Sequence, residues 1–145
     1  MNRDRLQATL ERHEGLRLTP YLDTVGKMTI GYGRNLDDNG ITQWEAEMLL
    51  AYDIGIATIA VVEVIPTIFL GLNDVRQEIL INMIYNLGPT RLLGFKKMIA
   101  ALDAFDYEKA ADEMLDSRWA VQVGQRAIEL AEWMRTGTIQ EVIPA

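Results

Sequence analysis

The sequence predicts an α+β fold with a small N-terminal lobe, one connecting helix and a helical C-terminal lobe. Residues 17–32 contain short apolar stretches separated by turn residues, which is typical of a small sheet. Residues 42–65 begin with a helix-start signal and continue without a break, and most of the remaining chain has apolar residues at helical spacing. A length of 145 residues suits one domain or two small lobes on one chain.

The first predicted element is a helix over residues 3–13. Leu6, Leu10 and His13 recur on one face, with charged residues between them. Gly15 follows directly and is a typical residue for ending a helix. The chain therefore changes from helical to extended structure within a few residues of position 15.

A short sheet is predicted next, in two or three strands. Residues 17–21 and 27–32 are expected to form strands, joined by the turn residues 23–26. Gly26 is free to take the positive φ that such turns need. Residues 37–40, Asp-Asp-Asn-Gly, are expected to form a further turn.

The connecting helix is predicted over about residues 42–65. Thr42 and Glu45 have the spacing of a capping box, and Pro66 is expected to end the helix. The second half is rich in isoleucine and valine, so a strand is the alternative there.

The C-terminal lobe is predicted to be helical. Its expected helices cover about residues 74–87, 92–104, 107–117 and 125–135. Residues 1–145 are expected to form one domain, with an N-lobe at about 14–45, a connecting helix at about 42–65 and a C-lobe at about 66–145. The first helix is expected to pack on the C-lobe.

Composition excludes several classes of function. The chain has no cysteine and one histidine, so no disulfide, thiolate metal site or histidine cluster is expected, and no cofactor is expected. A formal net charge of −7 disfavours nucleic acid as a partner. It also predicts a weak dependence of activity on salt, unless Arg34, Arg118 and Arg126 create a locally positive cleft.

Membrane insertion and secretion are not expected. The most apolar stretch, residues 54–72, is interrupted by Glu63 and Pro66, and it is expected to pack against the C-lobe or a second subunit. The N-terminus has no apolar segment of the kind that follows the charged start of a signal peptide.

Two carboxylates stand out by position among the 21 acidic residues. Glu14 lies at the end of the first predicted helix, where the partial negative charge of the helix favours a protonated carboxyl. Asp23 lies in a turn, where it is expected to stay ionised. One protonated and one ionised carboxyl suit the cleavage of a glycosidic bond. Both positions are also common for purely structural residues, so residue type alone leaves either role open.

The surrounding sequence is more specific. Glu14 is followed by glycine, Asp23 lies nine residues further on, and Thr29 follows six residues after that. The chain also contains these segments: His13-Glu14-Gly15-Leu16-Arg17, Thr29-Ile30-Gly31-Tyr32-Gly33, Asn86-Leu87-Gly88, Ser117-Arg118-Trp119, Gln125-Arg126-Ala127 and Arg135-Thr136-Gly137. Together they resemble the phage-type lysozymes over nearly the whole chain. The resemblance implies a lysozyme-like fold of two lobes with a cleft between them.

The resemblance also implies an activity. Members of this family hydrolyse the β-1,4 bond between N-acetylmuramic acid and N-acetylglucosamine in bacterial peptidoglycan. Glu14 would be the general acid, and Asp23 and Thr29 would hold the attacking water. The anomeric centre would then be inverted, although Asp23 acting as a nucleophile in a retaining reaction stays open.

Four further residues are expected to bind substrate by the same resemblance. Arg126 matches an arginine beside the catalytic glutamate, and Tyr85 and Asn86 fall where the C-lobe lines the cleft. Arg34 stands where the family's best-known pattern has histidine; it keeps a positive donor but cannot titrate near neutral pH. The segment after Asn35 is short, which implies a trimmed N-lobe.

Bacterial peptidoglycan is thus the expected partner of a monomeric enzyme. Such an enzyme would reside in the host cytoplasm until its release to the cell wall. Three other functions remain open: a non-catalytic wall-binding or inhibitory protein, a membrane-active protein built on residues 54–72, and a chitinase-like or transglycosylase activity using the same acid.

Overall fold

A computed structural model describes residues 1–141. The chain divides into two compact units, unit 1 from Met1 to Leu49 and unit 2 from Leu50 onward. The boundary falls inside one continuous helix, α3 (Gln43–Val64). Within the described residues, no helix combines the length and apolar character needed to cross a membrane. The expected packing of the first helix on the C-lobe stays a prediction.

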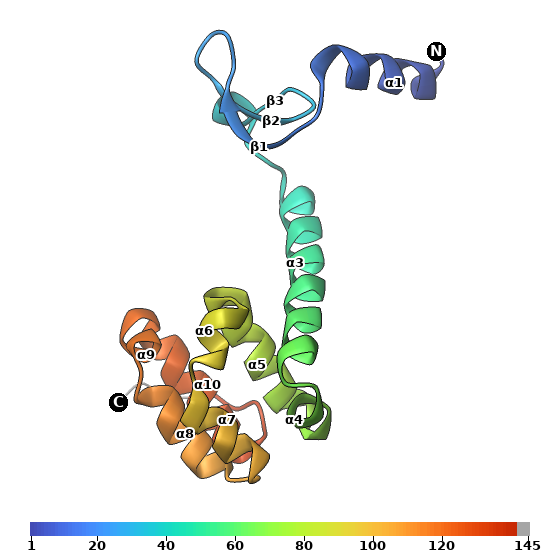
Figure 1. Ribbon diagram of the computed structural model, residues 1–145. Coiled ribbons are helices and arrows are strands. Elements are labelled where there is room, and N and C mark those ends of the chain that lie inside the picture. Colours follow the sequence, from blue (N-terminus) through green and yellow to red (C-terminus); the bar gives the residue numbers. More distant parts are fainter. Residues whose placement is uncertain (142–145) are drawn as a thin grey trace. The chain divides into compact units, whose positions relative to one another are not determined.

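Unit 1 contains a helix, a small sheet and a short second helix (Figure 1). These elements are α1 (Arg3–Glu14), β1 (Arg17–Leu22), β2 (Met28–Gly31), β3 (Arg34–Asn35) and α2 (Leu36–Asn39). The sheet is antiparallel in the order β1-β2-β3. Tyr21 lies opposite Thr29, and Arg17 lies opposite Gly31. The predicted α+β class is confirmed, with three strands.

The segment after β3 differs from the prediction of a plain turn. It forms α2, which begins after the cap residue Asn35 and is followed by the C-cap Gly40, with φ 54°. Two aspartates hold α2 on the hairpin: Asp37 accepts a hydrogen bond from the backbone N–H of Met28 at 2.8 Å, and Asp38 pairs with Lys27 at 2.9 Å. A helix this short has little intrinsic stability, so the sequence pattern alone predicts a turn. The contacts of Asp37 and Asp38 supply the stability that the helix lacks by itself.

The capping box at the start of α3 is confirmed. The Thr42 hydroxyl accepts from the backbone N–H of Glu45 at 3.2 Å, and the Glu45 carboxylate accepts from the backbone N–H of Thr42 at 2.7 Å. The helix then runs without a break to Val64. The alternative strand in its second half is therefore wrong, because packing outweighs the preference of β-branched residues for strands.

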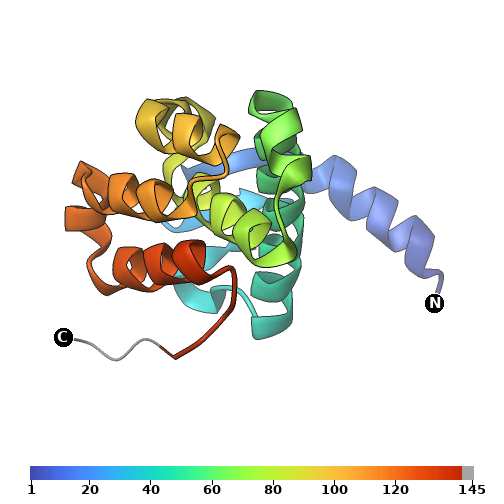
Figure 2. The same cartoon turned by 90° about the horizontal axis from the view of Figure 1, so that it is seen from below.

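Unit 2 is helical (Figure 2). After α3 its helices are α4 (Pro66–Gly71), α5 (Asp74–Leu87), α6 (Pro89–Leu93), α7 (Lys96–Asp103), α8 (Tyr107–Leu115), α9 (Arg118–Val123) and α10 (Gln125–Thr136). Its buried apolar core includes Leu80, Met83, Met98 and Met134. The apolar stretch 54–72 contributes its inner face to this core through Ala57, Val61, Ile65, Phe69 and Leu72.

The helices of unit 2 differ from the sequence prediction in three places. Pro66 ends α3 as expected but also begins α4, because proline suits the first turn of a helix. The helix expected over residues 92–104 is two helices, α6 and α7, separated at Gly94 and Phe95. Helix α9 was not predicted at all; Ser117 caps it by accepting from the N–H of Ala120 at 3.1 Å.

Arg76 fastens the start of α5 to the end of α10. Its Nε donates to the carbonyl of Met134 at 2.8 Å, and its Nη2 donates to that of Arg135 at 3.0 Å. Its guanidinium also lies 3.5 Å from the centre of the Tyr107 ring. One side chain thereby satisfies carbonyls in the last turn of α10 that have no partner within the helix.

Candidate active site

Glu14 is the last residue of α1, and the chain turns away at Gly15 with φ 71°. Its carboxylate lies against Gly33, in the turn between β2 and β3: a Cβ on residue 33 would fall 2.7 Å from Glu14 Oε2. No hydrogen bond from a described residue reaches this carboxylate. Both oxygens are thus available to an incoming molecule.

Asp23 follows β1 and is held by the backbone of the next turn. Its Oδ1 accepts from the N–H groups of Val25 at 2.9 Å and Lys27 at 2.8 Å. Its own N–H donates to the carbonyl of Lys27 at 2.9 Å. The second carboxylate oxygen, Oδ2, accepts no hydrogen bond from the part of the chain that the structure describes.

Thr29 and Asp23 both form hydrogen bonds with the backbone of Lys27. The Thr29 hydroxyl donates to the Lys27 carbonyl at 2.9 Å, so that carbonyl accepts from both Asp23 and Thr29. Thr29 is 3% exposed and is the only buried polar residue among residues 1–141. The peptide groups of Lys27 therefore set the positions of two candidate catalytic residues. Sequence reasoning missed Lys27 because it acts through its backbone.

Arg34 forms hydrogen bonds with two other residues of unit 1, Glu45 and Gly40. It forms a bidentate ion pair with Glu45, at 2.6 Å from Nη2 and 3.1 Å from Nη1, and also donates to the carbonyl of Gly40 at 3.3 Å. The Arg34 hydrogen bonds, together with that from the backbone N–H of Thr42, lower the pKa of Glu45 to about 2. In this arrangement Arg34 links β3 to the start of α3; its expected contact with substrate stays a prediction.

The other expected substrate-binding residues lie in unit 2. Asn86 Oδ1 accepts from the Trp119 indole at 2.9 Å. Arg126 donates to Asn82 Oδ1 from Nε at 2.9 Å and from Nη2 at 2.6 Å. Tyr85 is 48% exposed and lines a cavity of about 380 Å³. The expected proximity of Arg126 to Glu14 stays a prediction.

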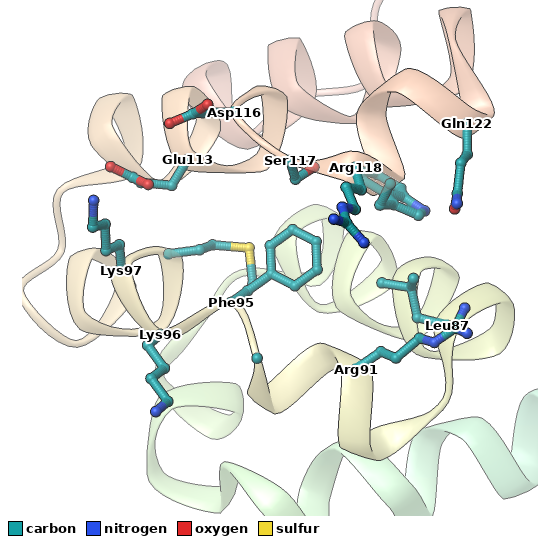
Figure 3. A pocket seen from close by; sticks show the side chains of 13 residues that line it. Leu87, Arg91, Phe95, Lys96, Lys97, Glu113, Asp116, Ser117, Arg118 and Gln122 are labelled. Atoms are coloured by element: carbon teal, nitrogen blue, oxygen red, sulfur yellow. The ribbon is translucent and has the colours of Figure 1, made fainter.

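A larger cavity in unit 2 was not foreseen. It has a volume of about 710 Å³ and lies between the α6–α7 segment and the α8–α9 segment. We call it the cationic pocket, because four basic residues line it: Arg91, Lys96, Lys97 and Arg118. Figure 3 shows Arg118 and Phe95 among the side chains that line this pocket.

The acidic residues Glu113 and Asp116 also line the cationic pocket. Within residues 1–141 none of its four basic residues forms an ion pair. Of these four basic residues the sequence pointed to Arg118 alone, because the others come from separate helices that tertiary packing brings together. No group of acidic, histidine or cysteine residues suited to a metal ion occurs within the described chain.

Comparison with known proteins agrees with the resemblance read from the sequence. The model of the phage lysozyme family matches residues 11–133. "Probable T4-type lysozyme 1" of Dictyostelium discoideum is 28% identical over 90% of this chain and 93% of its own length. An "Endolysin" of Acyrthosiphon pisum secondary endosymbiont phage 1 is 30% identical over 77% of this chain and 74% of its own length.

A longer protein also contains a matching region. The "Pre-baseplate central spike protein Gp5" of Enterobacteria phage T4 is 30% identical over 90% of this chain but only 28% of its own length. The family match includes Glu14, Asp23 and Thr29 and most of unit 2. The chain therefore belongs to the phage lysozyme family and is a lysozyme, an enzyme that hydrolyses peptidoglycan.

Proposed function

We propose that this lysozyme cleaves the β-1,4 bond between N-acetylmuramic acid and N-acetylglucosamine. Glu14 is the general acid, and Asp23 and Thr29 hold the attacking water. The observation that carries the proposal is the arrangement around Lys27. It fixes Asp23 and Thr29 through backbone hydrogen bonds while leaving an acceptor free on each.

The two free acceptors define how a water molecule would be held. Because the Thr29 hydroxyl gives its proton to the Lys27 carbonyl, its oxygen can only accept a further hydrogen bond. Oδ2 of an ionised Asp23 is likewise an acceptor. A water bound by both donates its two hydrogens to them and keeps a lone pair for the anomeric carbon. Asp23 can then take the proton that the water loses as it attacks.

Glu14 is suited to donating a proton, whereas Asp23 accepts one. Its carboxyl group is free of hydrogen bonds within the described residues, so a proton on it can be donated to a substrate oxygen. A general acid must carry that proton when the substrate binds. When the glycosidic bond breaks, the Glu14 proton passes to the leaving sugar oxygen and water supplies the hydroxyl on the other fragment.

The positions of the two carboxylates favour inversion over a covalent intermediate. Glu14 lies at Gly33, just beyond the end of β2, whereas Asp23 is tied to Lys27, just before its start. The strand between them advances the backbone by about 10 Å. Inverting glycosidases need a wider gap between their carboxyls than retaining ones, because a water must fit beside the sugar.

The cationic pocket explains how a protein with a net charge of −7 can bind an anionic cell wall. Peptidoglycan is anionic, so a chain with this charge is repelled from it at long range. The pocket collects four basic residues that no ion pair neutralises within residues 1–141, and they outnumber its two acidic residues. We therefore assign to the pocket the contact with negatively charged groups of the wall.

The test is the activity and product of Glu14→Gln and Asp23→Asn on purified peptidoglycan. Both substitutions keep the shape of the side chain and remove its charge or transferable proton. Each should lower the rate of turbidity loss by about 10²-fold or more while leaving the melting temperature near that of the parent. Substantial activity in Glu14→Gln would remove Glu14 from the acid role.

Product mass separates the proposal from its rivals. Hydrolysis gives muropeptides with a free reducing muramic acid, whereas a transglycosylase gives anhydro products that are lighter by one water. A wall-binding protein without catalysis gives no new products, and a chitinase-like activity releases only N-acetylglucosamine oligomers from chitin.

A further inference from the structure

We infer that Gly33 is a positioning residue for the catalytic carboxyl, and that its missing side chain is what allows Glu14 to sit where it does. This inference rests on the proposed role of Glu14 as the acid. A Cβ at position 33 would lie 2.7 Å from Glu14 Oε2, 3.1 Å from Cδ and 3.4 Å from Cγ. Ordinary contact between such atoms begins near 3.4 Å. A methyl group would therefore displace the carboxyl by about 1 Å.

Nothing else on the described chain holds the Glu14 carboxyl in place. It accepts no hydrogen bond and forms no ion pair there, in contrast to Asp23, which two backbone N–H groups hold. Its location is thus set by the end of α1 and by the close approach of the Gly33 backbone. A group placed by packing alone moves when the surface beneath it gains an atom.

Position 33 requires glycine for its backbone conformation as well as for its contact with Glu14. The two requirements can be tested separately. Its φ is +76°, a value that side chains other than glycine rarely adopt. Gly31 in the same hairpin has a similar φ of +70°, but a Cβ there would meet no atom within 4 Å. The two glycines thus share the backbone requirement, and only Gly33 has the contact with Glu14.

The experiment compares Gly33→Ala with Gly31→Ala. Both variants are expected to lose similar stability in thermal unfolding, because both place alanine at a positive φ. Only Gly33→Ala should lose turnover, by about 10- to 100-fold in kcat, because a misplacement near 1 Å at a reacting group has effects of this size. Its KM should change little, since the sugar-binding surfaces are untouched. Gly31→Ala should keep kcat within about threefold of the parent.

Gly33→Asn is a second variant, which tests the inference if Gly33→Ala fails to fold. Asparagine tolerates positive φ better than alanine but carries the same Cβ, so it should fold better than Gly33→Ala and lose kcat to a similar extent. The kcat/KM profile should also change along its alkaline limb, which reports the ionisation of the acid, in both Gly33 variants and not in Gly31→Ala.

Three results would overturn the inference: equal kcat losses in Gly31→Ala and Gly33→Ala, a Gly33→Asn variant with parental kcat, or an effect confined to KM. Each of these leaves the proposed function standing if Glu14→Gln is inactive. An active Glu14→Gln would instead remove the proposed function itself, whatever the glycine variants do.

Discussion

Arg34 and Glu45 form a bidentate ion pair that joins strand β3 to the first turn of α3. The same Glu45 carboxylate accepts from the backbone N–H of Thr42, so one side chain caps the helix and binds the sheet. The pair thus couples the fold of unit 1 to the ionisation of a single carboxyl group.

That coupling predicts a loss of stability in acid. The pKa of Glu45 is about 2 in the folded chain, against an ordinary value of 4.5. Because the folded pKa is the lower one, the contribution of Glu45 is fully present above pH 4.5 and is lost as the pH falls toward 2. The melting temperature of Glu45→Gln should lie below that of the parent at pH 6 and approach it near pH 2. Glutamine keeps a cap acceptor, so a pH-independent difference would contradict the ion-pair explanation.

Thr29 allows a test of the water site that separates chemistry from folding. Thr29→Val removes the acceptor proposed for the water, and we expect kcat to fall by about 10²-fold. The Lys27 carbonyl keeps its bond from the Asp23 N–H, so the cost in unfolding free energy should be only about 1 kcal/mol. Thr29→Ser restores the hydroxyl and should restore most of the activity. Equal activity in the valine and serine variants would exclude Thr29 from holding the water.

The stereochemistry of the product tests the role of Asp23. A water attacking opposite the leaving group converts a β-linked substrate into an α product at first release. Proton NMR during the first turnovers, before mutarotation, should therefore detect the α anomer. Initial release of the β anomer, or a sugar trapped on Asp23, would make this residue a nucleophile and the enzyme a retaining one.

The cationic pocket can be tested through wall binding. Arg118→Gln removes a charge inside the pocket, and Lys109→Gln removes one on α8 that does not line it. In sedimentation with insoluble peptidoglycan at low salt, we expect Arg118→Gln to bind several-fold more weakly and Lys109→Gln to bind like the parent. High salt should remove the difference, because it screens exposed charges within a few ångströms. Equal weakening by both variants would assign the effect to net charge.

The Arg76 contacts predict a stability defect without a catalytic one. Arg76→Met removes two hydrogen bonds to the carbonyls of α10 and the contact with the Tyr107 ring. We expect a loss of about 2–3 kcal/mol in unfolding free energy. Calorimetry should detect a lower melting temperature, and kcat measured well below it should stay within about twofold of the parent. An unchanged melting temperature would show that water replaces these bonds at no cost.

Strong local signals allowed much of the fold to be predicted from the sequence. The capping pair Thr42 and Glu45 located the start of α3, and the turn after Asp23 located the hairpin. The short helices α2, α4 and α9 were missed because tertiary contacts stabilise them, such as the bond from Met28 to Asp37. The break between α6 and α7 was missed because Gly94 is compatible with helical spacing; it has φ −66° and ψ −19°.

The candidate site was predictable where it depends on side-chain spacing. Glu14, Asp23 and Thr29 became candidates through the intervals between them and the glycines around them, and their catalytic roles stay a prediction. The roles of Lys27 and Gly33 could not be read in this way, because one acts through peptide groups and the other through the absence of a side chain. The pairing of Arg34 with Glu45 depends on how β3 meets α3, which spacing along the chain does not determine.

The turn between Asp23 and Lys27 has a consequence for how this enzyme can change. Asp23 is held by main-chain N–H groups, so the identity of the side chain at Val25, which is 77% exposed, has no part in holding it. Mutational drift or a directed library can therefore introduce any residue except proline at position 25, next to the proposed catalytic carboxylate, without removing the N–H that holds Asp23. The turn holds Asp23 through its main chain and exposes the side chain at position 25 to solvent, so this position can change to suit different wall chemistries while the Asp23 carboxylate stays in place.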